Sequence, residues 1–351
     1  MYRNTYVEIN LKNIKENIKR IIEKHNDYKY YFGVVKADCY GHNDTKTVKA
    51  IIEGGCNYLA VSSLEEALEI RKKIKDIPIL CLGIINEKYI DTCIKNNIDI
   101  TISNLDYLKK IIDYKNLKVH IKVNTGMNRL GFNNREEINE CYEMINDSNM
   151  TLQGIYTHIY DAGNEERTNN QYKVFEELTK DIDLSKIPIV HVGASDVTIN
   201  YKKRPYANGC RLGICMYGLG DFNDIEPLPT FSVYSEVIQI NNVKEGTVGY
   251  SGNYKVNSDT LIAVVSIGYA DGIIRKNTGR SVYINNKEYE IVGNICMDML
   301  FVKVDDSVKV HDKVTIIKDI EHLNKIAKHL DTITYEVICS ISKRVPRKYK
   351  K

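Results

Sequence analysis

A lysine that directly follows an apolar run is the first candidate for chemistry in this sequence. Lys36 comes after residues 32–35 (FGVV), whereas most lysines lie on a solvated surface. An amine in apolar surroundings has a lowered pKa, so it becomes a competent nucleophile for a Schiff base with a carbonyl compound. Other reactive or ion-binding side chains stand at or after later apolar runs: Lys122, Arg129, His158, Ser195 and Arg211. Together these residue types favour covalent chemistry at an amine beside groups that bind anions.

Eight short apolar runs, rich in Val, Ile and Tyr, have the length of strands. They are residues 31–36, 58–62, 79–83, 98–102, 117–123, 152–158, 188–193 and 210–217. Helix-period stretches lie between most of them, and Ser63 with the glutamate three residues later predicts a capping box. Strand–helix alternation predicts a parallel sheet covered by helices, and eight units in about 200 residues predict a closed (β/α)8 barrel. A six-stranded doubly wound sheet is the alternative, but no convincing GxGxxG loop follows the first run.

Barrel enzymes carry their chemistry at the carboxyl ends of the strands. The first run ends at Lys36, the fifth carries Lys122 and the sixth ends at His158. The residues after the seventh and eighth runs, where barrels commonly hold phosphate, include Ser195, Gly213 and Ile214. An amine nucleophile together with a phosphate site suggests pyridoxal 5′-phosphate (PLP) as cofactor.

From about residue 230 the apolar residues alternate with period two and are separated by turn residues, which predicts an antiparallel β domain. Pro227 and Pro229 mark the expected boundary. We therefore expect a barrel domain over residues 1–229 and a β domain over residues 230–351. The alternating segment Thr5–Asn10 could join the second domain rather than the barrel.

The composition excludes several classes of partner. With 49 Lys+Arg against 46 Asp+Glu the formal charge is +3, which argues against nucleic acid as the main partner. No apolar run approaches the roughly 20 residues of a membrane helix, and the N-terminus lacks a signal-peptide core. The nine cysteines never form C-x-x-C, so neither a disulfide framework nor a metal site is expected, and a reducing cytoplasm fits best.

Several longer motifs resemble those of the alanine racemases, which are fold-type III PLP enzymes. They are VVKADCYGHN, HIKVNTGMNRLGF, THIYDAGN, HVGASD, CRLGICMYGLG, VGYSGNY, SIGYADGIIR, GNICMDM and YEVICSISKRVPRKY. They follow in the same order over essentially the whole chain. The resemblance implies a racemase that interconverts L- and D-alanine with two bases, acts as a homodimer with shared active sites, and supplies D-amino acid for peptidoglycan.

The resemblance also assigns residues to the cofactor. Lys36 would form the Schiff base and serve as one acid/base. Tyr40 would hydrogen-bond the phosphate, and Ser195, Gly213 and Ile214 would complete the phosphate contacts. His158 would pack against the pyridine ring, and Arg211 would face the pyridine nitrogen.

On the substrate side, Tyr250 resembles the second catalytic base, which in this family comes from the partner subunit. Arg129 would fix the substrate carboxylate and the Tyr250 phenol. Lys122 stands where many members carry a carbamylated lysine that holds this arginine. The residues expected close to the substrate are Met297, Asp298 and Tyr269.

Physical chemistry supports two of these roles. Racemisation removes a proton from one face of a planar carbon and returns one to the other, so two bases on opposite sides are the simplest solution. A phenol with a pKa near 10 must be shifted downward to act at neutral pH, which a nearby cation such as Arg129 would do. Arg211 cannot accept the pyridine proton, so the ring should stay largely neutral and side reactions should be restricted.

Four positions depart from the usual family pattern: Asp38, Gly163, Ala194 and Lys343. In many members a tyrosine that lines the substrate pocket stands at position 343, and a polar residue there could admit a hydroxyl. A serine or broad-specificity racemase is therefore the alternative function. A non-catalytic PLP-binding barrel would need no β domain, and a PLP decarboxylase of this fold type would lack the VGYSGNY and NICMDM segments, so both are disfavoured.

Overall fold

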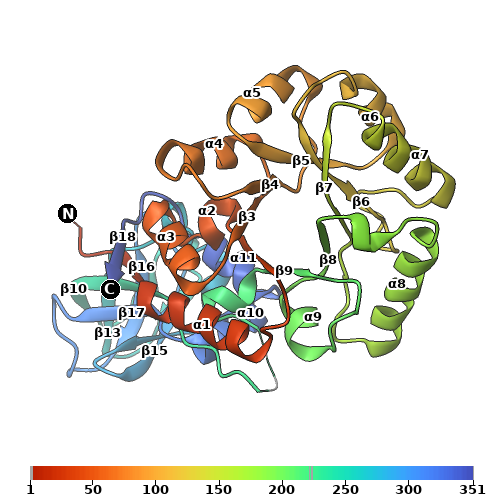
Figure 1. Cartoon of the computed structure of the whole chain (residues 1–351). Coiled ribbons are helices and arrows are strands. Elements are labelled where there is room, and N and C mark those ends of the chain that lie inside the picture. Colours follow the sequence, from red (N-terminus) through yellow and green to blue (C-terminus); the bar gives the residue numbers. More distant parts are fainter. Residues whose placement is uncertain (1–2, 221, 223, 351) are drawn as a thin grey trace.

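The computed structural model describes residues 3–220, 222 and 224–350. Its first half is a closed barrel of parallel strands inside a ring of helices (Figure 1). In neighbour order the strands are β2 (Tyr30–Val34), β3 (Tyr58–Val61), β4 (Ile79–Cys81), β5 (Ile98–Ile102), β6 (Lys118–Lys122), β7 (Thr151–Tyr156), β8 (Ile189–Gly193) and β9 (Gly209–Leu212). β9 pairs with β2 and closes the ring, which confirms the predicted barrel and excludes the doubly wound sheet.

Helices follow the strands in turn. They are α1 (Leu11–Lys24), α2 (Lys36–Tyr40), α3 (Asp44–Gly54), α4 (Leu64–Lys73), α5 (Ile90–Lys95), α6 (Leu105–Ile111), α7 (Arg135–Asn146), α8 (Glu165–Leu178) and α9 (Ser195–Asn200). Every residue of β3 and of β5 is buried, because barrel strands face the interior on one side and the helices on the other. This is why the strands appear in the sequence as continuous apolar runs.

Asparagine side chains begin several of these helices. The side-chain oxygens of Asn10, Asn104, Asn134 and Asn164 accept hydrogen bonds from backbone N–H groups three residues further on, at the starts of α1, α6, α7 and α8. Such N-caps satisfy donors that the helix itself leaves unpaired. They fix where each helix leaves the barrel rim.

The capping box predicted at α4 forms only in part. The Ser63 hydroxyl accepts from the Glu66 N–H, as expected. The Glu66 carboxylate does not return to Ser63: it accepts from the N–H of Ser62 at 2.8 Å and from the N–H of Ala37 at 2.6 Å. This carboxylate therefore braces the segment that follows Lys36.

The second half is an eight-stranded sheet in the order β13-β16-β15-β14-β17-β10-β1-β18. Its strands are β1 (Tyr6–Asn10), β10 (Phe231–Val243), β13 (Thr260–Val265), β14 (Ser281–Ile284), β15 (Lys287–Val292), β16 (Leu300–Val304), β17 (Lys313–Ile317) and β18 (Arg347–Lys350). β1 pairs antiparallel with β10 and parallel with β18, so both ends of the chain lie in this sheet (Figure 1).

A short hairpin and two helices complete this half. The hairpin strands β11 (Gly246–Val248) and β12 (Tyr254–Val256) pair with each other and carry the loop that contains Tyr250. The helices are α10 (Ile320–Leu330) and α11 (Thr334–Cys339), and α11 lies against α2 of the barrel. The C-terminal segment therefore reaches the turn that bears Lys36.

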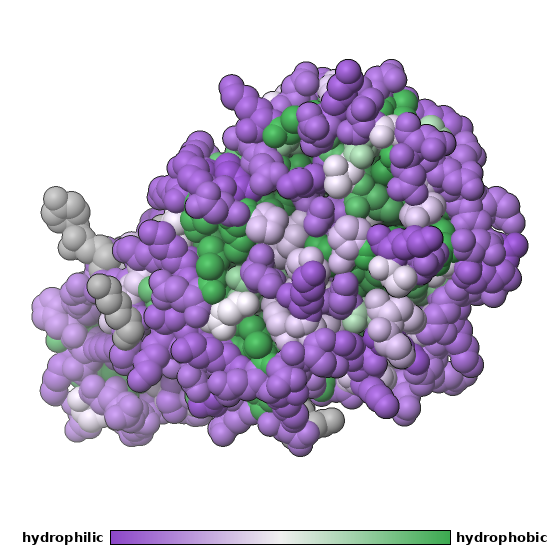
Figure 2. All heavy atoms as spheres, in the orientation of Figure 1, coloured by the Kyte–Doolittle hydropathy of each residue, from purple (hydrophilic) through white to green (hydrophobic). Residues whose placement is uncertain are grey.

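Hydrophilic side chains cover most of the face shown in Figure 2, and hydrophobic ones show through in smaller areas between them. None of the helices in the described ranges combines the length and the apolar character that crossing a membrane would take.

Candidate active site

Lys36 lies just beyond its strand rather than at its end. β2 ends at Val34, and Lys36 begins α2. The next four residues, 37–40, have φ angles between 51° and 55° and so form a left-handed turn. This conformation costs an L-residue about 1–2 kcal/mol, and bonds from the N–H of Cys39 to Val35 and from the N–H of Ala37 to Glu66 hold it in place. The turn brings both Lys36 and Tyr40 to the mouth of the barrel.

The Lys36 amine is half-buried, and its pKa is lowered. Burial is the main cause, and the charge of Arg129 adds to it, while the carboxylate of Glu66 opposes the shift. The amine therefore loses its proton at a lower pH than an exposed lysine, as a nucleophile requires.

Tyr40, Ser195 and Gly213 converge on one small space. The N–H of Gly213 donates to the Ser195 hydroxyl at 2.9 Å, and Ile214 begins the short helix η3 (Ile214–Tyr217) directly after it. A Cβ added to Gly213 would lie 3.3 Å from the Tyr40 hydroxyl and 3.5 Å from that of Ser195. Two hydroxyls and a glycine that leaves the backbone accessible suit the oxygens of a phosphate group.

Arg211 lies in the barrel interior and is buried. One guanidinium nitrogen donates to the carbonyl of His191 at 2.6 Å, and the other donates to the carbonyl of Thr157 at 2.7 Å. Burial lowers the pKa of Arg211 to about 10, so the group stays charged at neutral pH. These two backbone carbonyls hold the Arg211 guanidinium in one orientation.

Four of the barrel candidates act electrostatically on a fifth, His158. β7 ends at Tyr156, so His158 stands two residues beyond the strand. Burial lowers its pKa to about 2, and the charges of Arg211, Lys122, Arg129 and Lys36 all act in the same direction. The imidazole is therefore neutral, and four cationic groups lie within electrostatic reach of it.

Lys122 ends β6, as predicted, and its side chain is buried. Its amine donates to the Val123 carbonyl at 3.2 Å and lies 4.9 Å from the centre of the Tyr156 ring. Burial, followed by the charges of Arg211 and Arg129, lowers its pKa well below the ordinary value. The Lys122 amine therefore loses its proton more readily than an exposed lysine does.

The candidates from the second half form a separate group on exposed loops. Tyr250 is 70% exposed, Met297 53% and Tyr269 41%. The Asn294 amide donates to the Tyr250 carbonyl at 2.7 Å, and the N–H of Tyr269 donates to the Cys296 carbonyl at 3.0 Å, so one segment ties the loops together. Within the described part of one chain, no hydrogen bond or ion pair joins this group to the barrel candidates.

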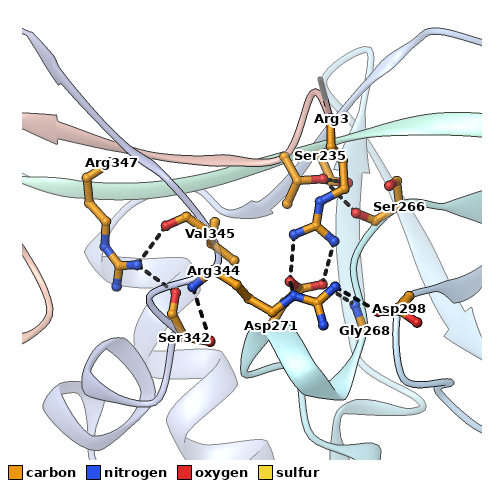
Figure 3. A network of polar contacts seen from close by, with 11 residues as sticks. Arg3, Ser235, Ser266, Gly268, Asp271, Asp298, Ser342, Arg344, Val345 and Arg347 are labelled. Atoms are coloured by element: carbon orange, nitrogen blue, oxygen red, sulfur yellow. Dashed lines mark hydrogen bonds and ion pairs between the residues drawn. The ribbon is translucent and has the colours of Figure 1, made fainter. Parts of the chain in front are cut away.

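Asp298 belongs to a network of arginines and carboxylates (Figure 3). Arg344 donates to Asp298 at 2.7 Å and lies 3.1 Å from the buried Asp271. Arg3 donates to both oxygens of Asp271, which also accepts from the N–H of Gly268 at 3.0 Å. The network anchors the turn at Tyr269 and leaves Asp298 paired with Arg344.

Two of the departures from the family pattern lie together. Lys343 forms an ion pair with Asp38 at 2.7 Å, and 78% of the lysine side chain is exposed. The Lys343 amine is therefore paired with Asp38, a residue of the turn that follows Lys36. Ala194, a third departure, precedes α9 and gives that helix no side-chain cap.

Sequence reasoning missed a set of buried polar side chains inside the barrel: Tyr58, Asp99, His120 and His191. They lie in β3, β5, β6 and β8 and connect to Arg211. The sequence pattern that could have identified them is an ionisable residue inside an otherwise apolar run, because such a residue must find polar partners in the interior. No group of three or more His, Cys, Asp or Glu side chains in the described residues could hold a metal ion.

A closed parallel barrel with a lysine amine beside two hydroxyls and an accessible glycine at its mouth, followed by an antiparallel β domain, defines the class of this protein as a barrel enzyme. The family model for the N-terminal domain of alanine racemases matches residues 9–221, and the model for the C-terminal domain matches residues 230–349. The chain belongs to the alanine racemase family.

Relatives match along the whole chain. Alanine racemase 1 of Bacillus subtilis is 34% identical over 99% of this chain and 93% of its own length. The alanine racemase of Lactococcus lactis subsp. cremoris is 35% identical over 99% of both chains.

Solved structures agree with this. Alanine racemase from E. faecalis has a TM-score of 0.94 at 31% identity and 99% coverage of both chains. Alanine racemase from Bacillus anthracis with bound L-Ala-P has a TM-score of 0.93 at 31% identity, covering 100% of this chain and 96% of that one. A histidine racemase from Leuconostoc mesenteroides shares the fold, with a TM-score of 0.91 at 24% identity, so the fold alone does not fix the substrate.

Proposed function

We propose that this protein is a PLP-dependent racemase that interconverts L- and D-alanine. The observation that carries the proposal is the pair of guanidinium cations, Arg211 and Arg129, that act with two lysine amines on the neutral His158 at the barrel mouth. A site so rich in positive charge attracts anions. A cofactor phosphate and a substrate carboxylate would supply them, and the names of the relatives favour alanine as substrate over serine.

The barrel residues present fit the cofactor. Lys36 would hold it through its amine, Tyr40, Ser195, Gly213 and Ile214 would hold its phosphate, and His158 would lie against its ring. When bound, the cofactor withdraws electrons from the α-carbon of the amino acid and so makes the proton there acidic. Arg211 has only donors, so at the pyridine nitrogen it can donate a hydrogen bond but cannot take a proton.

Two bases would act on opposite faces of the α-carbon. The Lys36 amine would exchange a proton on one face, and the phenol of Tyr250 from a second subunit would exchange it on the other. Arg129 would bind the substrate carboxylate, with Met297, Asp298 and Tyr269 close by. Dimerisation is supported by large apolar side chains that one chain leaves exposed in its second half together with Tyr250: Tyr269, Ile274, Met297 and Met299.

Lys122 would be carbamylated in the active protein. Carbon dioxide adds to neutral amines, and the lowered pKa of Lys122 supplies one. The product would be an anion between Arg211 and Arg129, where it would offset their charge and orient Arg129.

We further propose that residues 1–229 and 230–351 form the two domains, with the N-terminal strand belonging to the second. The nine cysteines are all free, and most are buried, which supports a reducing cytoplasm as the location. There the protein would supply D-alanine for peptidoglycan.

The test is an assay of purified protein with added PLP, measuring D-alanine formed from L-alanine and D-serine formed from L-serine. We expect D-alanine to form faster. Lys36→Ala should lose both racemisation and the visible absorbance of the bound cofactor, whereas Tyr250→Phe should keep the absorbance and lose racemisation. A wild-type protein that binds the cofactor but makes no D-alanine would refute the proposal.

A further inference from the structure

A chain of hydrogen bonds crosses the barrel interior and ends at Arg211. A guanidinium nitrogen of Arg211 lies 3.0 Å from Nδ1 of His191, and Nε2 of His191 lies 3.1 Å from Nδ1 of His120. Nε2 of His120 lies 3.5 Å from the Tyr58 hydroxyl, which donates to a carboxylate oxygen of Asp99, and this oxygen is also 3.5 Å from Nε2. All these side chains are at least 95% buried.

The donors and acceptors allow one direction along this chain. A guanidinium only donates, so Nδ1 of His191 must accept, and its proton lies on Nε2. That proton is donated to Nδ1 of His120, which leaves the His120 proton on Nε2, where it faces the Tyr58 hydroxyl and, through it, Asp99. Both imidazoles are then neutral, and the sequence of donors runs from Arg211 through His191 and His120 to Asp99.

Packing prevents His191 from changing its orientation. Its ring is stacked 4.6 Å from that of Phe32 and 4.6 Å from that of Tyr156, with interplanar angles of 14° and 11°. Burial and the charges of Arg211, His120 and Lys122 lower its pKa well below the ordinary value, in agreement with a neutral ring. His191 can therefore be a rigid acceptor for Arg211.

Charge explains why such a chain is useful. The side chains that face Arg211 are His158 and Tyr156 from β7 and its loop, His191 from β8, and the cations Lys122 and Arg129. A buried guanidinium needs a compensating anion. In this interior the carboxylate of Asp99 is joined to Arg211 through the two polarised imidazoles.

We propose that Asp99, His120 and His191 are positioning residues for racemisation, which hold Arg211 in one orientation at the pyridine nitrogen and bring it the compensating charge of Asp99. The catalytic consequence rests on the proposed function of Arg211. The hydrogen bonds of the relay itself do not depend on that proposed function.

Asp99→Asn tests the role of the charge, because the amide oxygen can still accept the hydrogen bond of the Tyr58 hydroxyl. Thr101→Val is the matched control: Thr101 is buried in the same strand and bonded to Cys81 and to Tyr156, whose ring stacks on His191, so the variant disturbs the packing around the relay but removes no charge. Removing one buried unit charge at the distance of Asp99 from Arg211 should change the activation free energy by an amount that corresponds to about a tenfold change in kcat. We expect kcat to fall about tenfold in Asp99→Asn, with cofactor absorbance retained, and to stay within about twofold in Thr101→Val. Equal kcat values in the two variants would overturn the proposal.

Nitrogen-15 NMR of the histidine rings in the wild-type holoenzyme provides a readout besides activity, and it decides the matter if Asp99→Asn does not fold. We expect His120 and His191 to be neutral with the proton on Nε2. In Asp99→Asn the Nε2 proton of His120 should move to lower frequency, because a neutral acceptor makes a weaker bond. A charged His191, or one with its proton on Nδ1, would refute the relay. Failure of the wild type to racemise alanine would instead refute the proposed function.

Discussion

Two lysines of the barrel have lowered pKa values for the same physical reasons but differ in access. Burial lowers the pKa of both, and neighbouring arginines lower it further. Lys36 is half-buried at the mouth, where a carbonyl compound could reach it. Lys122 is buried against Val123 and Tyr156. We therefore expect the first to react with a cofactor and the second with carbon dioxide, which is small enough to enter.

Carbamylation of Lys122 gives a direct prediction. Holoenzyme equilibrated with ¹³C-bicarbonate should show a carbamate signal in its ¹³C NMR spectrum, and Lys122→Arg should lack it, since an arginine is not deprotonated. Racemisation by Lys122→Arg should fall about tenfold because Arg129 loses an anion that orients it, an effect of the size given by one close buried charge. A wild type without the signal would show that Lys122 acts as a free amine.

At the scale of elements, the segment after Lys36 shows where sequence patterns stop being informative. Apolar periodicity predicted β5 with its observed bounds, because packing against a core produces that pattern. It extended the first strand to Lys36, whereas β2 ends at Val34 and the chain turns left-handed after Lys36. Nothing in ADCY favours positive φ, since such a turn is imposed by its surroundings. Glu66, a capping residue in the sequence, is part of those surroundings.

Glu66→Ala should therefore destabilise the turn as well as the helix. Losing an acceptor for two backbone N–H groups should cost about 1–3 kcal/mol, measured by urea unfolding, and kcat should fall because Lys36 moves. Glu65→Ala, in the same helical turn but exposed, is the control and should change the unfolding free energy by less than about 0.5 kcal/mol. Glu66→Gln should recover part of the loss. Equal stability of Glu66→Ala and Glu65→Ala would show that the carboxylate does not brace the turn.

The buried relay shows a similar limit of sequence analysis. His120 and His191 lie inside runs whose other residues are apolar, and their spacing along the chain gives no sign that they touch. Only closure of the barrel brings β5, β6, β8 and β9 around one interior. Family motifs located Lys36, Ser195 and Arg211, whereas the partners that hold Arg211 required the three-dimensional structure.

At the scale of the whole molecule, histidines that are neutral when folded make stability depend on pH. Burial lowers the pKa of His42 and His322 to about 4 and that of His158 to about 2. Unfolded histidines titrate near 6.5, so below that pH the unfolded chain takes up protons that the folded chain does not. The stabilisation is full above pH 6.5 and is lost as the pH falls toward 4.

We expect the thermal midpoint, followed by circular dichroism because the chain has no tryptophan, to fall steeply between pH 6.5 and 5. Each such histidine contributes about 1.4 kcal/mol per pH unit. His42→Asn should make the pH dependence shallower even if it lowers the midpoint at pH 7. An unchanged midpoint over this range would contradict the neutral state of these rings.

The two halves of the chain carry complementary parts of the chemistry. The barrel holds the Lys36 amine and the proposed phosphate site, and the β domain carries the Tyr250 phenol on an exposed loop. Racemisation by two bases requires that the barrel of one subunit meet the β domain of the other across a dimer. The Lys36 amine and the Tyr250 phenol must then lie on opposite faces of one α-carbon.

Mixing two inactive variants tests this requirement most directly. Lys36→Ala and Tyr250→Phe dimers, unfolded together and refolded with PLP, should give hybrid dimers in which one of the two sites has both wild-type groups. Random pairing of subunits predicts recovery of about a quarter of the wild-type alanine racemase activity. If hybrid dimers form and bind the cofactor but no activity returns, the amine and the phenol do not share a site between subunits, and the two-base account is wrong.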